Sequence, residues 1–410
     1  MKIKIILATL LLQVAAFAQK TTEAFESKKL GVTRSISVVL PQGYDQDKNK
    51  KYPIFVVQDG DYLLDLISSN IRYGAYWDEY PDFIFVGINQ GKDRKNDTTF
   101  DQNGLPAEGG ASYFEFIGME LLPYIESKYR TIPYRVIAGH GLTAAFQNAY
   151  LYKDTSIFNG YINLSPEMPT EMENRVGDRF KALTAPIFYF LAQAEGDLKQ
   201  DKAQIQKLDA NIKALKKENI YYNFVDYKGY NHYSYVNQAI PDALQFMFKG
   251  YERISMEEFQ AKIATLEKGH TQYLVDRYAT YKKKTGYAPQ IRLTDFEAIE
   301  AAILKNQNFE DLKTLADIAD KEYPKTMLGA YHRALYEEKM NDFDRAYKAY
   351  MKAFQLEPVR NLTKELMVDR AEFFKKELKN YKDKRKNRGN EPEEPISETP
   401  SEGVADTPLQ

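Results

Sequence analysis

The hydrophobic pattern of the chain changes near residue 250. Before that point, short runs of β-branched and aromatic residues alternate with segments whose apolar residues recur every three or four positions. Seven such runs predict strands at 36–40, 53–57, 83–87, 136–138, 160–164, 187–191 and 221–225. Helical patterns lie near 62–71, 113–129, 144–152, 199–217 and 240–248. Several strands are almost continuously apolar, as in sheets covered on both faces, so the pattern predicts an α/β domain with a doubly wound, mostly parallel sheet.

Residues 251–380 contain no further strand pattern and predict a smaller, all-α domain. An internal repeat with an offset of 34 residues aligns Asp342 with Asn308 and Pro358 with Pro324. The second repeat resembles a tetratricopeptide repeat because it has small, aromatic, small and proline residues at that family's positions: Ala346, Tyr350, Ala353 and Pro358. The first, from about residue 294 to 323, has Leu312 where a small residue is expected. The resemblance implies a helical surface for a protein partner.

The two ends of the chain differ in composition from these domains. Lys2 and Lys4 precede an apolar run that ends in Ala16-Phe17-Ala18, which predicts a secretory signal peptide over residues 1–18. The alternative is a buried strand or a short anchor helix. The run is too short to span a bilayer comfortably, so we expect an exported protein, periplasmic or secreted, with no membrane span. Residues 381–410 are rich in Pro, Glu, Ser and Gly and predict a disordered tail.

Composition narrows the chemistry further. The 410 residues are too many for one ordinary domain, and we place the boundary between domains 19–250 and 251–380. A net charge of −2 gives no support to nucleic-acid binding. The absence of cysteine excludes thiol catalysis, disulfides and a lipoprotein anchor. No two of the four histidines have metal-ligand spacing, so we expect neither a metal nor a cofactor.

The segment Tyr134–Ala145 has an unusual arrangement of residues around a sharp turn. An apolar strand leads into Gly139-His-Gly-Leu142, and a helical pattern follows. This is the layout of a nucleophile elbow, in which G-x-S-x-G holds a serine on a strained strand-to-helix turn. Here Gly141 stands at the serine position and Thr143 replaces the closing glycine. The sequence therefore predicts a hydrolase framework without its nucleophile.

The first domain also resembles a family, the putative esterases of the α/β-hydrolase fold that include enterochelin-esterase-like enzymes. The resemblance covers most of residues 30–250 and depends on the order of several blocks. These are Val38–Pro41 with Tyr44; Tyr52–Gly60; Gly87–Asn89 with Asp93, Arg94 and Asp97; Glu120–Thr131; Ser165-Pro166; and Asn231–Ser234. Each block alone is weak evidence.

The resemblance implies a role for several residues. His232 matches the position of the general base, and Asp197, with Glu195 as the alternative, would supply the acid that orients it. The backbone N–H of Leu142 and one near Gly60-Asp61 would form the oxyanion hole. The catalytic position at Gly141 is vacated. Substitute hydroxyls would have to come from Thr143, Ser165 or Ser234, none of which stands at the nucleophile position of the family pattern.

Three functions are compatible with this sequence. The leading hypothesis is an exported, non-hydrolytic esterase-like protein that binds a small ester, an anion or a protein. The alternative is an active carboxylic-ester hydrolase in which His232 activates water without an acyl-enzyme intermediate. The third is a structural scaffold whose helical domain binds the partner.

Overall fold

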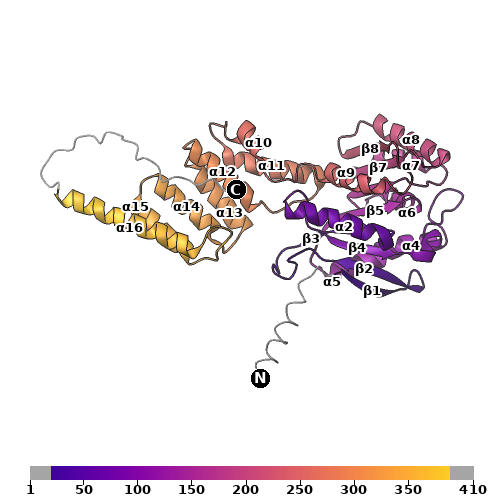
Figure 1. Cartoon of the computed structure of the whole chain (residues 1–410), viewed down its shortest axis with the longest axis horizontal. Coiled ribbons are helices and arrows are strands. Elements are labelled where there is room, and N and C mark those ends of the chain that lie inside the picture. Colours follow the sequence, from indigo (N-terminus) through magenta and orange to yellow (C-terminus); the bar gives the residue numbers. More distant parts are fainter. Residues whose placement is uncertain (1–19, 388–410) are drawn as a thin grey trace, which may run out of the picture. The chain divides into compact units, whose positions relative to one another are not determined.

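A computed structural model describes residues 20–387 of the chain (Figure 1). The predicted signal peptide at 1–18 and the part of the predicted tail beyond residue 387 lie outside these residues. The described chain forms two compact units. The first contains the residues up to Phe259 together with Gln272–Asp295, and the second contains Gln260–Thr271 and the residues from Phe296 onward.

The first unit is built on one sheet of eight strands in the order β1-β2-β4-β3-β5-β6-β7-β8. β1 pairs antiparallel with β2, and β2 antiparallel with β4, whereas every later pair is parallel. The mostly parallel sheet predicted from the sequence is therefore confirmed. Its strands are β1 (Lys20–Ser27), β2 (Val32–Val39), β3 (Tyr52–Val57), β4 (Ile84–Asn89), β5 (Thr131–His140), β6 (Gly160–Leu164), β7 (Ile187–Ala194) and β8 (Ile220–Tyr227).

β1 is the strand that the sequence pattern missed. It lies at the edge of the sheet and is largely exposed, so its sequence KTTEAFES lacks an apolar run. The buried strands were visible because both of their faces are covered. β3, for example, is buried along its whole length.

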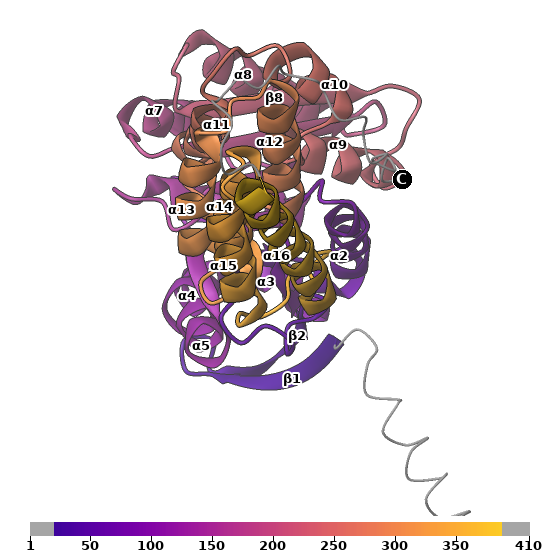
Figure 2. The ribbon, with the colours of Figure 1, turned by 90° about the vertical axis from the view of Figure 1, so that its left-hand side faces the viewer.

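Helices cover the sheet on both faces. α2 (Gly60–Tyr76) and α9 (Val236–Phe248) pack on one face, where Phe55 and Val57 of β3 contribute to the core. The other face, with Ile54 and Val56, is covered by α4 (Gly109–Glu115), η3 (Phe116–Leu121), α5 (Leu122–Lys128), α6 (Leu142–Phe146), η4 (Gln147–Tyr152), α7 (Met172–Ala182) and α8 (Lys199–Ala214). Figure 2 shows α2 and α9 on one side of the strands and α4, α5 and α7 on the other. The short η2 (Gly91–Asp93) and α3 (Arg94–Asp97) follow β4.

The first unit extends beyond the predicted boundary at residue 250. α10 (Met256–Glu258) follows α9, and most of α11 (His270–Thr285), including Tyr281, belongs to the first unit, whereas most of η5 (Phe259–Ile263) belongs to the second. Tyr281 packs against Tyr251, with ring centroids 5.8 Å apart, and Tyr287 packs against Tyr134 of β5 at 5.5 Å. These aromatic contacts tie the segment Gln272–Asp295 to the sheet, although its sequence pattern is purely helical.

The second unit is a stack of helices: α12 (Leu293–Lys305), α13 (Asp311–Glu322), α14 (Met327–Lys339), α15 (Phe343–Phe354) and α16 (Lys364–Asn387). Ala346, Tyr350 and Ala353 of α15 are buried in a core with residues of α14 and α16. Paired helices of this length are compatible with the predicted repeat, and the tetratricopeptide identity stays a prediction. α16 continues to Asn387, inside the segment predicted to be disordered.

No helix in the described range 20–387 is long and apolar enough to cross a membrane. In the same range, no group of three or more His, Asp or Glu side chains is arranged to hold a metal ion.

The parallel strands direct several polar residues to one edge of the sheet. Asp59, Gly141, Ser165 and Asp197 come within three residues of the carboxyl ends of β3, β5, β6 and β7, respectively. His232 follows β8, the neighbour of β7. Ligands of open α/β sheets bind at the carboxyl ends of the strands, so this edge is the candidate functional site.

Candidate functional site

The turn between β5 and α6 has the backbone shape of an elbow. Gly141 has φ +61° and ψ −117°, a conformation that costs little free energy for glycine and is strained for other residues. A Cβ atom at Gly139 would lie 2.7 Å from Oγ1 of Thr143 and 2.8 Å from the backbone N of Ala144. The glycine at 139 is therefore required by close packing, whereas the glycine at 141 is favoured by its positive φ.

The carboxylate of Glu167 lies beside Gly141. A Cβ atom at Gly141 would be 2.7 Å from Oε1 of Glu167 and 3.4 Å from Nη2 of Arg94. The Glu167 backbone N–H donates to the Gly141 carbonyl at 3.1 Å, which fixes the acid beside the turn. The side chain is partly exposed and makes no hydrogen bond or ion pair within the described chain. The Glu167 carboxylate thus lies within contact distance of any side chain at residue 141.

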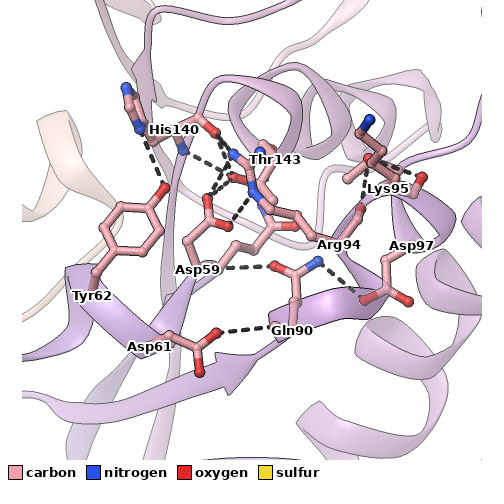
Figure 3. Close-up of polar contacts among 12 residues, drawn as sticks. Asp59, Asp61, Tyr62, Gln90, Arg94, Lys95, Asp97, His140 and Thr143 are labelled. Carbon is pink, nitrogen blue, oxygen red and sulfur yellow. Dashed lines mark hydrogen bonds and ion pairs between the residues drawn. The ribbon is translucent and has the colours of Figure 1, made fainter. Parts of the chain in front are cut away.

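A buried network of hydrogen bonds among Asp59, Arg94 and Thr143 holds the backbone of the elbow in place (Figure 3). The side chain of Asp59 is 1% exposed and accepts hydrogen bonds from Thr143 Oγ1 at 2.5 Å and from Arg94 Nε at 2.6 Å. Arg94 Nη2 also donates to the carbonyl of His140, and the His140 N–H donates to Thr143 Oγ1 at 2.9 Å. Burial lowers the pKa of Arg94, but the hydrogen bond and charge of Asp59 outweigh burial and raise it overall. Arg94 is thus a fixed cation.

This network explains the threonine at the closing position of the elbow. Thr143 is fully buried, and its hydroxyl joins Asp59 to the backbone of His140. Its single proton is committed to a carboxylate, which leaves no free hydroxyl for attack. Thr143 therefore has a structural role here.

His232 and Asp197 are joined by a direct hydrogen bond. Nδ1 of His232 lies 2.7 Å from Oδ1 of Asp197. Asp197 also accepts from Ser165 Oγ at 2.6 Å and from the N–H of Ala194 at 2.8 Å. Burial raises the pKa of Asp197, but the hydrogen bonds from His232, Ser165 and Ala194 outweigh burial and lower it overall. An ionised Asp197 only accepts, so Nδ1 of His232 carries a proton that it donates to Asp197, and Nε2 makes no contact within the described residues.

Glu195, Ser165 and Ser234 each make a hydrogen bond to a group other than the His232 side chain. Glu195 accepts from the N–H of Gly229 at 2.7 Å. Ser165 is buried with its hydroxyl on Asp197, and Ser234 Oγ accepts from the N–H of Asn231 at 3.1 Å. Of the two carboxylates considered from the sequence, the one that contacts His232 is therefore Asp197.

His140 connects the elbow to the loop that carries His232. Its Nε2 lies 3.0 Å from the carbonyl oxygen of His232, so Nε2 is protonated and Nδ1 accepts from the hydroxyl of Tyr62 at 3.2 Å. The rings of His140 and His232 are 4.4 Å apart between centroids. Burial, helped by the charge of His232, lowers the pKa of His140 to about 4. His140 is thus a neutral positioning residue.

The shifted pKa of His140 predicts a pH-dependent loss of stability. The folded protein holds that pKa at about 4, against 6.5 for the free group, so the unfolded chain takes up the proton first as the pH falls. The stability due to neutral His140 is complete above the free value and is lost progressively toward pH 4. At about pH 5 the loss amounts to roughly 2 kcal/mol.

Urea unfolding of wild type and His140→Gln, at neutral pH and at about pH 5, tests this prediction. The variant has no titratable group at residue 140. We therefore expect its free energy of unfolding to fall by about 2 kcal/mol less than that of wild type between neutral pH and about pH 5. Protonation of Asp197 lowers the free energy of unfolding equally in both proteins, so its contribution cancels in the comparison. Equal losses in the two proteins would contradict the prediction.

The backbone donors expected from the resemblance lie at two helix N-termini. Leu142 is the first residue of α6, and Gly60 and Asp61 are the first two of α2. N–H groups at these positions have no acceptor within their own helix. A Cβ at Gly60 would lie 2.9 Å from the backbone of Gly87, so glycine is needed for the close approach of α2 to β4. Their role as an oxyanion hole stays a prediction.

Sequence reasoning missed part of this site. Asp59 and Arg94 stand in blocks that carry the family resemblance, yet no role was assigned to them. Glu167 follows Ser165-Pro166 by one residue, and nothing in its local sequence shows that it reaches Gly141. Only the pairing of β5 with β6 brings the two segments together, with His140 opposite Leu164.

Comparisons with known proteins agree with this architecture. A crystal structure of an uncharacterised protein from Capnocytophaga ochracea is 28% identical, with a TM-score of 0.75 over 87% of this chain and 100% of the other. An IroE-like serine hydrolase from Shewanella oneidensis is 20% identical, with a TM-score of 0.57 over 74% and 99%. The second likeness shows the fold alone. No protein with a curated function matches the sequence.

The family assignment depends on the sequence of the first unit. Residues 27–247 match the family described as Putative esterase, which is more than half of the chain. The match includes the elbow, the His232–Asp197 pair and both helix N-termini described above. The chain therefore belongs to the putative esterase family and has an esterase-like fold.

Proposed function

We propose that this protein is a non-hydrolytic member of the putative esterase family, which binds a ligand at the site around Gly141. The observation that carries the proposal is the carboxylate of Glu167 at the nucleophile position, 2.7 Å from where a Cβ of residue 141 would lie. The site therefore lacks the atom that forms an acyl-enzyme, and an acidic group stands in its place.

The absence of the nucleophile is by itself expected to lower the rate of ester hydrolysis strongly. In a serine hydrolase, removal of the serine lowers kcat by about 10⁶, and the remaining groups give only residual catalysis. The other members of the triad cannot compensate, because they act as a unit with the serine. His232 and Asp197 thus keep their geometry without a hydroxyl to activate.

Glu167 adds an electrostatic obstacle to ester hydrolysis. Hydrolysis places negative charge on the carbonyl oxygen, and backbone donors such as the N–H of Leu142 would have to stabilise it. A carboxylate beside Gly141 repels that charge. Arg94 offsets the repulsion only in part, because its guanidinium is hydrogen-bonded to Asp59.

One observation favours the second candidate, a hydrolase that uses water directly. The hydrogen bond of 2.7 Å between His232 and Asp197 would be the correct arrangement for a general base. In that case the Nε2 atom of His232 would take a proton from water, and the hydroxide would attack the ester carbonyl without an acyl-enzyme.

Ester hydrolysis by the purified protein distinguishes the two functions. We expect turnover of activated short-chain esters, and of a broader panel of acyl, aryl and sugar esters, to equal that of buffer. His232→Ala serves as the matched control, since it removes the base and leaves the elbow unchanged. Turnover well above buffer that disappears in His232→Ala would refute the non-hydrolytic proposal and support the water mechanism.

The remaining parts of the proposal concern location and partners. The N-terminal pattern at 1–18 supports an exported protein, periplasmic or secreted. The helices of the second unit, with their buried Ala346, Tyr350 and Ala353, support a tetratricopeptide-like surface for a protein partner.

A further inference from the structure

We infer that the site around Gly141 binds a ligand through an alkylammonium group. The inference rests on the proposed function, because it names the ligand class of the same non-hydrolytic site. An esterase site is built to receive an electrophilic carbonyl. The groups that surround Gly141 instead present hydrogen-bond acceptors, negative charge and exposed aromatic rings.

Two acceptors at the site have no partner within the described part of the chain. The carboxylate of Glu167 makes no hydrogen bond or ion pair there. Nε2 of His232 is also free, since the contacts of this residue are made by Nδ1 and the backbone. Both acceptors adjoin the elbow: Glu167 lies at Gly141, and His232 lies on the ring of the preceding residue, His140. Free acceptors recognise a donor, and an ammonium group carries three.

The charge of the site favours a cation. Asp59, Asp197 and Glu167 contribute three carboxylates, and Arg94 contributes one guanidinium that Asp59 already holds. His140 is neutral at pH 7, because its pKa is about 4. Excluding His232, the formal charge around the elbow is therefore −2, which repels the carboxylate of an anionic ligand.

Two exposed tyrosines complete the site. Tyr62 is 51% exposed and Tyr233 is 76% exposed. Their rings contact the ring of His140 at centroid distances of 6.2 and 5.9 Å, respectively. Figure 3 shows Tyr62 with its hydroxyl directed at His140. Exposed aromatic rings favour an ammonium ligand, because the face of a ring attracts a cation.

Nuclear magnetic resonance of the four histidines tests the inference on the whole purified protein. With ¹³C-labelled histidine, the His232 signal is identified by its absence in His232→Gln. We titrate hexylammonium, hexanoate and hexan-1-ol, which share one apolar chain and differ in the head group. The signals of His270 and His332, which are buried in the second unit, serve as an internal reference.

We expect hexylammonium to shift the His232 signal saturably, with hexanoate and hexan-1-ol causing no comparable shift. Glu167→Gln should weaken the response about tenfold, since it replaces a charged acceptor with a neutral one. Glu218→Gln, which removes an exposed carboxylate after α8, is the matched control and should respond as wild type. A preference for hexanoate, an equal response to all three probes, or no response would overturn the inference.

The ester assay is run on the same samples, so the two proposals can fail separately. Ester turnover that depends on His232 refutes the non-hydrolytic function, whichever of the three probes binds. Absence of turnover together with absence of a selective ammonium response refutes the inference alone.

Discussion

Gly141→Ser combined with Glu167→Ala is expected to hydrolyse activated esters, whereas Gly141→Ser alone stays near background. The added serine restores a nucleophile in an elbow that already has φ +61°. In the single variant its Cβ would lie 2.7 Å from Oε1 of Glu167. The acid can swing aside because it is flexible, but its negative charge stays near the developing oxyanion. We expect the double variant to exceed the single variant by about 100-fold, a factor like that of losing one oxyanion-hole donor.

The measurement has two parts: release of the alcohol product, and labelling of the protein by a fluorophosphonate probe. Labelling should locate to residue 141 in the double variant and be absent in wild type, which has no hydroxyl there. Gly141→Ala with Glu167→Ala is the matched control, since it has the Cβ and lacks the hydroxyl. Equal activity of the single and double serine variants would show that Glu167 is no obstacle.

Asp97→Ala is expected to cost about 3–5 kcal/mol of unfolding free energy, because it removes the nearer carboxylate from the buried guanidinium of Arg34. The remaining carboxylate, that of Asp93, is 46% exposed and lies 3.7 Å from Arg34. Asp97 of α3 is fully buried, and its Oδ1 lies 2.8 Å from Nη2 of Arg34 in β2, which is 4% exposed. Burial raises the pKa of Asp97 more than the charge of Arg34 lowers it, so the ionised acid depends on this partner. The pair anchors α3, and with it Arg94, against the sheet.

Urea unfolding monitored by circular dichroism measures this cost. Asp178→Ala is the matched control, since it removes an acid from an ion pair with Lys181 whose side chains are 71% and 64% exposed. Such a pair is worth about 0–1 kcal/mol. The double variant Arg34→Ala with Asp97→Ala should lose less unfolding free energy than the sum of the two single variants. The reason is that the double variant removes both charges, whereas each single variant leaves one of them behind. A strictly additive double variant would contradict the assigned pairing.

The sequence was most informative where physical constraints are local or periodic. The strands β3 to β7 were predicted because burial on both faces requires nearly continuous apolar runs. The elbow was visible because Gly139 and Gly141 mark a turn with little room for side chains. The helix α7 was missed, since its exposed face is charged and Gly177 interrupts its pattern.

The sequence by itself determined the class of the fold, the family and the absence of a serine at residue 141. It also put His232 and Asp197 in the correct order for a pair, leaving Glu195 as an alternative. Only the tertiary structure decided which acid contacts His232 and which carboxylate lies beside Gly141. Glu167 and Arg94 reach Gly141 from different loops, after β6 and β4. Contacts between distant segments leave no periodic trace in a single sequence, so they emerge only when the sheet has set the strands side by side.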